Sequence, residues 1–341
     1  MRRPKALLTT GRLPVSLDLA RTLYAGGYNV HAADSLPFHI CQSSRAVEKT
    51  TRTRPPQSDP QGFRQDLLNL VAQENPDLVI PTCEEAIYLA DLRGELPPQC
   101  TAVVDSFETL LTFHSKWKFP NLARNFGLEA PATIYWHPSD PHPCDTLDVD
   151  IAVLKPEFSR GGHSVHFVQR NQPLPLLKPL ESGNSWVAQA AVAGPTLCSF
   201  SLAFEGRLAT NVFYRPVVTL GNVGVSFHRL DNPLALRWVE TFIESTKYNG
   251  FISFDFIEGN SGPSAIECNP RITSGLHLAP PAELWRGINL FLGGPFVDSR
   301  SAGSEPRISH QVLGGRGVFV IPFYIPSCRL KYVEAMGSFQ P

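Results

Sequence analysis

The stretch Phe251-Ile-Ser-Phe-Asp-Phe-Ile-Glu-Gly-Asn-Ser-Gly-Pro-Ser-Ala-Ile-Glu-Cys-Asn-Pro-Arg271 decides the fold. Two apolar strands flank a Gly-Asn-Ser-Gly segment, which is a strong signal for a β-hairpin. If the strands pair symmetrically about Ser261, Asp255 lies opposite Glu267. Side chains alternate along a strand, so Asn269 shares the face of Glu267. Like charges that face each other on a sheet are destabilising, and this pattern therefore predicts a cation between the two carboxylates.

The polar face of this hairpin has the composition of a magnesium site. Two carboxylates and an amide oxygen on one rigid face are the hard donors that Mg²⁺ prefers. We therefore predict that Asp255, Glu267 and Asn269 hold Mg²⁺ or Mn²⁺, with water or phosphate oxygens completing the shell. A solvated outer face without a ligand is the alternative. It fits less well, because the strands are strongly hydrophobic and because Arg271, which could reach a phosphate, follows directly.

A metal site of this kind implies nucleotide phosphates, so cations are expected upstream. Lys155 ends the apolar strand 151–155, and the glycine-rich loop 159–164 follows it. A lysine at a strand end can place its charge on one phosphate while loop N–H groups cover others. Lys116 is the second candidate. Each lysine alone is more often a surface residue, and only the acidic hairpin makes both of them candidates for phosphate binding.

The first 110 residues alternate strand and helix patterns, which is typical of a parallel sheet covered on both faces. Strands are predicted at 5–9, 29–33 and 78–80, with helices from Pro14 and across 63–71. Thr82 and Glu85 form a capping-box pattern that predicts a further helix. The turn after the first strand has one glycine where the dinucleotide-binding fingerprint needs three. We expect this region to serve as a scaffold or to bind an acceptor substrate.

Composition and charge limit the classes of partner. The chain has 341 residues, 43% of them hydrophobic, and 30 basic against 31 acidic side chains. It should therefore be globular and consist of about two domains. Its near-zero net charge gives no positive electrostatic field that would hold nucleic acid or an anionic membrane. No stretch resembles a signal peptide or a membrane span. The seven cysteines form no CxxC pair, which favours a reducing compartment, the cytoplasm.

The pattern changes in the second half of the chain. Residues 137–150 are rich in proline and aspartate and are predicted to form a loop or linker. Short strands joined by glycine turns follow, and a helix is predicted after Asn232. Residues 293–313 are predicted to form a loop before an apolar strand at 318–325.

The order of the motifs resembles the ATP-grasp superfamily. The resemblance covers roughly residues 5–279 and is closest to the branch of the carbamoyl-phosphate synthetase large subunit, which includes carboxylate–amine ligases such as the enzyme that makes mycosporine-glycine. The run Val79-Ile-Pro-Thr-Cys-Glu-Glu85 also resembles that branch. The remaining motifs are Ser115-Lys-Trp-Lys-Phe119, Val153-Leu-Lys-Pro156 followed by Arg160-Gly-Gly162, Trp186-Val-Ala-Gln189 followed by Gly194-Pro195, Ser253-Phe-Asp-Phe256 and Ile266-Glu-Cys-Asn-Pro-Arg271.

The resemblance implies an ATP-grasp fold, α/β and α+β in class, with an N-terminal Rossmann-like parallel sheet. The domains it implies are 1–112 for the Rossmann-like domain, 113–192 for a lid lobe with the glycine loop, 193–292 for a metal and nucleotide lobe, and 293–341 for a divergent C-terminal segment.

The resemblance also implies roles for individual residues. Lys116 and Lys155 would contact phosphates below a mobile loop formed by Arg160, Gly161, Gly162, His163 and Ser164. Adenine would lie on a hinge formed by Gln189, Ala190, Ala191 and Val192. Arg215 would lie near the terminal phosphate, and Arg271 on the transferred phosphoryl group.

Two departures from the family pattern are visible. Thr196 stands where many relatives have a glutamate for the ribose hydroxyls, and a threonine offers a single hydroxyl. Pro120 falls within the helix expected after Lys116, where it would remove a backbone hydrogen bond at a cost of about 3 kcal/mol unless the helix begins later.

The activity implied by the resemblance is ATP-dependent ligation of a small carboxylate and a small amine through an acyl phosphate, in specialised metabolism. No nucleic acid or membrane partner is expected, and a homodimer is compatible with the sequence. Two alternatives stay open: a nucleotide-binding protein that has lost turnover, and a carbamoyl-phosphate-like kinase acting on bicarbonate.

Overall fold

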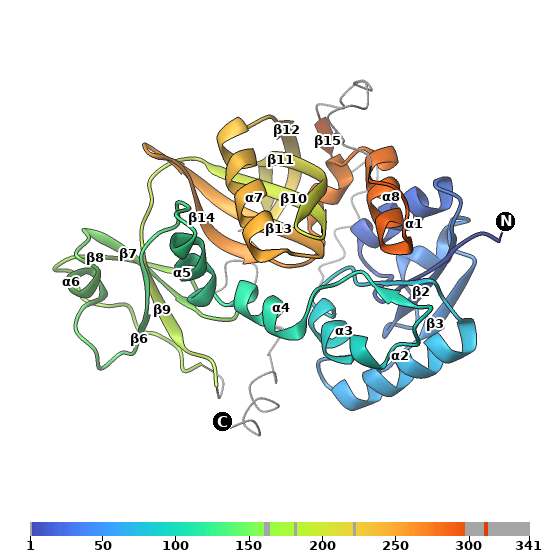
Figure 1. Ribbon diagram of the computed structural model, residues 1–341. Coiled ribbons are helices and arrows are strands. Elements are labelled where there is room, and N and C mark those ends of the chain that lie inside the picture. Colours follow the sequence, from blue (N-terminus) through green and yellow to red (C-terminus); the bar gives the residue numbers. More distant parts are fainter. Residues whose placement is uncertain (1, 160–163, 181–182, 221–222, 297–309, 313–341) are drawn as a thin grey trace.

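The computed structural model describes residues 2–159, 164–180, 183–220, 223–296 and 310–312, which form three sheets (Figure 1). The first is a parallel sheet in the order β3-β2-β1-β4-β5. Its strands are β1 (Lys5–Leu8), β2 (Asn29–Asp34), β3 (Lys49–Arg52), β4 (Leu78–Ile80) and β5 (Thr101–Ala102). The short polar strand β3 and the two-residue strand β5 carry no apolar pattern, and the sequence did not predict them.

Helices cover both faces of the parallel sheet, as the sequence predicted. Leu8 and Ile80 pack on the side of α1 (Pro14–Ala25), whereas Leu7 and Val79 pack on the side of α2 (Pro60–Glu74) and α3 (Ala86–Leu92). This alternation follows from the two-residue period of a strand. The class of the fold, mixed α/β with antiparallel sheets after the parallel one, is thus confirmed.

The helix predicted after Thr82 begins later than the capping box implies. The Thr82 N–H donates to Glu85 Oε1 at 2.8 Å, which is one half of the box. The Thr82 hydroxyl, however, donates to the Thr10 carbonyl at 2.9 Å and does not cap the helix. The helix α3 therefore starts at Ala86, and residues 82–85 form a partly buried turn at the carboxyl end of β4.

The carboxyl end of β2 explains why this sheet is a poor dinucleotide site. In a dinucleotide-binding fold an acid near this position holds the ribose. Here Asp34 accepts hydrogen bonds from the Gly11 N–H at 2.9 Å and the Arg12 Nε–H at 3.1 Å. Its carboxylate is engaged by the turn that follows β1, in agreement with the single glycine of that turn.

The second sheet has the order β6-β9-β7-β8 with antiparallel pairing throughout. Its strands are β6 (Thr133–Trp136), β7 (Ile151–Pro156), β8 (His166–Gln169) and β9 (Trp186–Ala190). The segment 137–150 is not only a linker: it contains the helix α6 (Pro143–Leu147), whose Cys144 is fully buried against this sheet. A helix of five residues is too short to show a hydrophobic period.

Two helices connect the first two sheets, α4 (Phe107–His114) and α5 (Lys118–Asn125), and both pack on β14 of the third sheet. Pro120 lies in the first turn of α5, where its missing N–H leaves no bond unmade. The helix thus begins late enough for Pro120 to cost no hydrogen bond, which is the condition that the sequence set.

The third sheet has the order β14-β13-β10-β11-β12-β15. Its strands are β10 (Thr196–Phe204), β11 (Arg207–Leu220), β12 (Val223–Leu230), β13 (Gly250–Gly259), β14 (Gly262–Asn269) and β15 (His310–Val312). The strand β15 lies within the segment predicted as a loop, and the predicted strand 318–325 lies outside the described residues. The helix α7 (Pro233–Thr246) begins after the Asn232 cap as predicted, because the Asn232 side chain accepts from the Ala235 N–H.

An aromatic core lies between α7 and one face of this sheet. The Trp238 and Phe242 rings of α7 are stacked 5.4 Å apart, and both contact the ring of Phe254 from β13. The opposite face packs on α8 (Pro281–Asn289), which also contacts α1 (Figure 1). Four short 3₁₀ helices complete the described fold: η1 (Ile40–Ser43), η2 (Arg93–Glu95), η3 (Ser274–Leu278) and η4 (Leu290–Leu292).

The buried His31 of β2 should make the stability of the protein depend on pH. Burial lowers the pKa of His31 to about 4, while the unfolded chain takes up the proton near the ordinary value of 6.5. The folded state therefore binds fewer protons in this window, and stability should fall as pH drops from 6.5 to 4, by about 3 kcal/mol. Urea unfolding at several pH values should show this loss, and His31→Gln should reduce it. An unchanged pH profile in the variant would contradict the prediction.

Candidate functional site

The acidic hairpin pairs Asp255 with Glu267, as the sequence predicted, but for a different reason. The turn consists of two residues, and Gly259 pairs with Gly262. Regular pairing from this turn would set Asp255 opposite Ile266. A β-bulge after Ala265, which faces Phe256, adds one residue to β14 and moves Glu267 into register with Asp255.

Two buried lysines surround Glu267. Lys116 Nζ lies 3.4 Å from Glu267 Oε1 and donates to the Ser159 carbonyl at 2.7 Å. Lys155 Nζ donates to the carbonyl of the bulged residue Ile266 at 3.1 Å and to Gln189 Oε1 at 2.8 Å. The lysines are 3% and 5% exposed, so neither is a surface residue. The two candidate lysines and the acidic hairpin thus come together in one cluster.

The charged residues of the cluster shift one another's pKa values. Burial lowers the pKa of Lys155 to about 8, an effect that Glu267 opposes and Lys116 reinforces. Burial alone would raise the pKa of Glu267, but the charges of Lys116 and Lys155 bring it below its ordinary value. Glu267 is therefore the ionised partner of two cations.

The pKa of Asp255 is shifted in the opposite direction to that of Glu267. Burial, and then the charge of Glu267, raise the pKa of Asp255, because the two carboxylates face each other. The Cys198 thiol from β10 hydrogen-bonds to Asp255, and Asn269 Nδ2 donates to Asp255 Oδ2 at 3.4 Å. The repulsion between Asp255 and Glu267 is the condition under which a cation between them stabilises a sheet.

Arg271 extends the cluster towards the parallel sheet. Its Nη2 lies 3.1 Å from Asn269 Oδ1 and 3.0 Å from Glu84 Oε1. Its Nη1 donates to the Ile272 carbonyl at 3.0 Å. Arg271 Nε is buried without a hydrogen-bond partner among the described residues. A guanidinium held in this way presents one unused N–H group near the acidic face.

The structure does not bring Arg215 to this cluster. Side chains alternate along β11, and Tyr214 is paired with Cys198 and so shares the face of Asp255. Arg215 therefore points to the other face, where it forms an ion pair with Glu258. Glu258 also accepts from Asn232, the cap of α7. The family resemblance could not reveal which face of the strand this residue occupies.

The predicted hinge lies at the end of β9 and just after it. Gln189 is buried, and its amide bridges Lys155 and Thr133. The Ala190 and Ala191 N–H groups donate to the carbonyls of Ala132 and Ile151. Val192 is half-buried, and Thr196 is exposed at the start of β10. Of the predicted loop, Ser164 is described with a left-handed φ of 62°, whereas Arg160, Gly161, Gly162 and His163 lie outside the described residues.

Sequence reasoning missed three neighbours of the cluster. His114 ends α4, and burial together with the charges of Lys116 and Arg271 lowers its pKa to about 4, so the ring is neutral at pH 7. Cys198 contacts Asp255, and Glu84 pairs with Arg271. The signal for Glu84 was present in the run 79–85, but nothing in the sequence showed that this run faces the hairpin.

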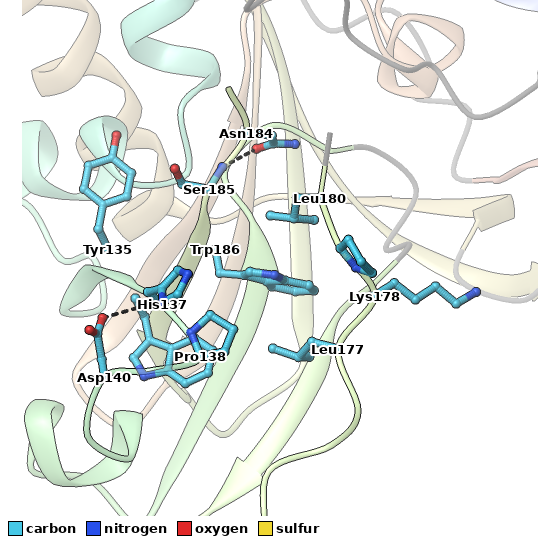
Figure 2. Close-up of a pocket in the computed structure, with 12 residues that line it drawn as sticks. Tyr135, His137, Pro138, Asp140, Leu177, Lys178, Leu180, Asn184, Ser185 and Trp186 are labelled. Carbon is cyan, nitrogen blue, oxygen red and sulfur yellow. Dashed lines mark hydrogen bonds between the residues drawn. The ribbon is translucent and has the colours of Figure 1, made fainter. Parts of the chain in front are cut away.

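A separate pocket of about 610 Å³ lies at one end of the second sheet (Figure 2). Trp136, Trp186 and Leu177 are among the residues that line it. The two indoles are 4% and 6% exposed, so they belong mainly to the core of this sheet. None of the cluster residues Lys116, Lys155, Asp255, Glu267, Asn269 and Arg271 lines this pocket.

The comparisons with known proteins concern the family and the fold. Residues 113–275 match the model of the ATP-grasp domain, so the chain contains an ATP-grasp domain. The comparison with curated proteins gave no match. No helix among the described residues is long and apolar enough to cross a membrane.

Solved structures share the fold. The L-amino acid ligase from Bacillus licheniformis is 16% identical, with 82% of this chain and 70% of that chain covered and a TM-score of 0.59. A biotin carboxylase domain from Hydrogenobacter thermophilus, in complex with MgADP, ADP and bicarbonate, is 12% identical over 86% and 70% of the chains, with a TM-score of 0.65. N5-carboxyaminoimidazole ribonucleotide synthetase from Thermus thermophilus is 14% identical over 86% and 80%, with a TM-score of 0.64. At these identities the likeness shows the ATP-grasp fold alone.

Proposed function

We propose that this protein is an ATP-dependent carboxylate–amine ligase whose site is the cluster on the acidic hairpin. The observation that carries the proposal is the pairing of Asp255 with Glu267 next to the buried Lys116 and Lys155. Lys116 Nζ lies 3.4 Å from Glu267 Oε1. Opposed, half-buried carboxylates beside buried lysines are costly for a fold that has no ligand for them. The arrangement suits a nucleotide whose phosphates bind the lysines while a metal ion binds the acids.

The donor set fits Mg²⁺. Asp255 and Glu267 supply two carboxylates, and Asn269 lies on the same face. The Asn269 amide oxygen accepts from Arg271 and its nitrogen donates to Asp255, so the amide would turn to offer its oxygen to the metal. No group of three or more His, Cys, Asp or Glu side chains suited to a metal occurs among the described residues, so the proposed site has two carboxylates and one amide. Bound Mg²⁺ would neutralise charge on the phosphate oxygens of the nucleotide.

The chain's own residues would then perform the following chemistry. Lys116 and Lys155 bind phosphate oxygens, and the unused N–H of Arg271 is available to the phosphoryl group in transfer. An oxygen of the substrate carboxylate attacks the terminal phosphorus of ATP, and the bond to ADP breaks, which gives an acyl phosphate. The amine then attacks the acyl carbon and inorganic phosphate leaves, so that an amide bond forms. The site must exclude water, because acyl phosphates hydrolyse readily.

Three finer points belong to the same proposal. The 113–192 lobe would act as the lid, the 193–292 lobe would hold metal and nucleotide, and the parallel sheet of 1–112 would bind or position the acceptor. The adenine would lie against Gln189–Val192. A role in specialised metabolism, in the cytoplasm, fits the family branch that the sequence resembles most.

The test is ADP release from Mg-ATP by the full-length chain, measured with pools of small carboxylic acids and amines. We expect release that requires both an acid and an amine, together with mass-spectrometric detection of a condensed product. Tight Mg-ATP binding without turnover under any pairing would instead identify a nucleotide-binding protein. Release that requires ammonia and bicarbonate but no organic acid would identify a carbamoyl-phosphate-like kinase.

A further inference from the structure

A contact between the parallel sheet and the acidic hairpin has no role in the chemistry described so far. Glu84 lies in the turn that follows β4, and its Oε1 is 3.0 Å from Arg271 Nη2. The two residues are 187 positions apart in the sequence. Their side chains are 18% and 16% exposed, so the ion pair is largely shielded from water.

The turn that carries Glu84 is held rigidly. Its neighbour Glu85 is buried and accepts from the Thr82 N–H at 2.8 Å and from the Thr9 hydroxyl at 2.9 Å. The Thr82 hydroxyl in turn accepts from the Ser16 hydroxyl of α1 at 2.9 Å. Glu85 therefore anchors the turn to β1, and the adjacent Glu84 carboxylate is presented at the carboxyl end of the parallel sheet.

The contacts of Arg271 leave one of its donors for a ligand. Both Nη atoms are engaged, by Ile272, Asn269 and Glu84. Two hydrogen bonds and the ion pair with Glu84 restrain the guanidinium, and Nε is a buried donor without a hydrogen-bond partner among the described residues. A fixed guanidinium directs its remaining N–H more accurately than a free one, because little conformational freedom is lost when a ligand arrives.

We propose that Glu84 is a positioning residue, which acts through Arg271 to aim the Nε–H at the phosphoryl group in transfer. This inference rests on the proposed function. It makes the parallel sheet part of the phosphoryl-transfer machinery, in addition to any contact the sheet makes with the acceptor. Glu84 does not touch the nucleotide. Its carboxylate holds Arg271 in the orientation that points the Nε–H at the phosphoryl group during transfer.

The test uses calorimetric titration of the full-length chain with Mg-ADP alone and with Mg-ADP plus aluminium fluoride, a mimic of the phosphoryl group in transfer. The wild type should bind the second combination more tightly. Glu84→Gln should keep its affinity for Mg-ADP within about twofold but lose the additional tightening by about tenfold, because the guanidinium is no longer fixed. Glu108→Gln, which changes an exposed glutamate of α4, is the matched control and should behave as the wild type.

A double-mutant cycle separates positioning from general destabilisation. Arg271→Lys removes the Nε donor and the planar fork, so Glu84→Gln should have no further effect in that background. Additive effects of the two substitutions, or full retention of the tightening in Glu84→Gln, would overturn the inference while leaving the proposed function intact. Failure of the wild type to bind Mg-ADP at all would overturn the proposed function, and this inference with it.

Discussion

Replacing Asp255 with asparagine and Glu267 with glutamine should abolish the Mg²⁺ dependence of nucleotide binding and weaken binding of Mg-ADP by roughly 100-fold. The two amides keep the shape of the hairpin but remove both negative charges that would bind the metal. Calorimetric titration with Mg-ADP, and with ADP in the presence of a chelator, measures the two quantities separately. In the wild type these titrations should differ strongly, and in the double variant they should coincide.

The folded state of this variant has to be checked, because Glu267 also balances Lys116 and Lys155. Leaving two buried lysines without their carboxylate should lower the free energy of unfolding by about 3 kcal/mol. Circular dichroism at the titration temperature establishes that the variant is folded. Glu258→Gln is a matched control, since Glu258 lies on the same hairpin but on the face of α7. If binding of Mg-ADP were undiminished in the double variant, the metal site would have to lie elsewhere.

Gly194→Ala should lower the free energy of unfolding by about 3 kcal/mol or more. Gly194 lies between β9 and β10 with a φ of 152°, and a Cβ added there would lie 2.0 Å from the Glu258 carbonyl oxygen. The obstacle is backbone of β13, so no side chain can move aside to relieve it. The segment around Gly194 joins the predicted hinge to β10, and its displacement should therefore also weaken nucleotide binding.

Gly127→Ala provides the comparison for this prediction. Gly127 also has a positive φ, of 72°, but an added Cβ would meet no atom within 4 Å. Its substitution should cost about 1 kcal/mol, from backbone strain alone. Urea unfolding of the two variants separates the clash from the strain. Equal losses of stability would show that the close approach to Glu258 does not restrict residue 194.

The sequence predicted most of what depends on local pattern. The parallel sheet, the hairpin and the capped helix α7 follow from strand alternation, glycine turns and the Asn232 cap. Lys116 and Lys155 could be predicted because a metal site on the acidic hairpin implies nucleotide phosphates, which in turn require cationic side chains. The roles implied for Arg271, the hinge and Thr196 came from the family resemblance, and they stay predictions until the variants are measured.

What could not be predicted depends on contacts between distant segments. Arg215 and Tyr214 are adjacent in sequence, yet only the pairing of β10 with β11 determines which of them faces Asp255. The pairing of Glu84 with Arg271 depends on how the parallel sheet lies against the hairpin. The helix α6 was missed because a single turn buries too few residues to leave a periodic pattern.

The extra residue in β14 determines on which face of the sheet Glu267 lies. In an unbroken ladder from the same turn, Asp255 would face Ile266, and Glu267 would point among the rings beneath α7. Deleting one codon of the bulge would close the ladder and still leave the acid opposite Asp255, whereas the strand at its present length needs the bulge to keep that acid out of the aromatic layer. The place at which one strand accommodates its extra residue, and not only its composition, thus decides whether the acid meets Asp255 or the rings.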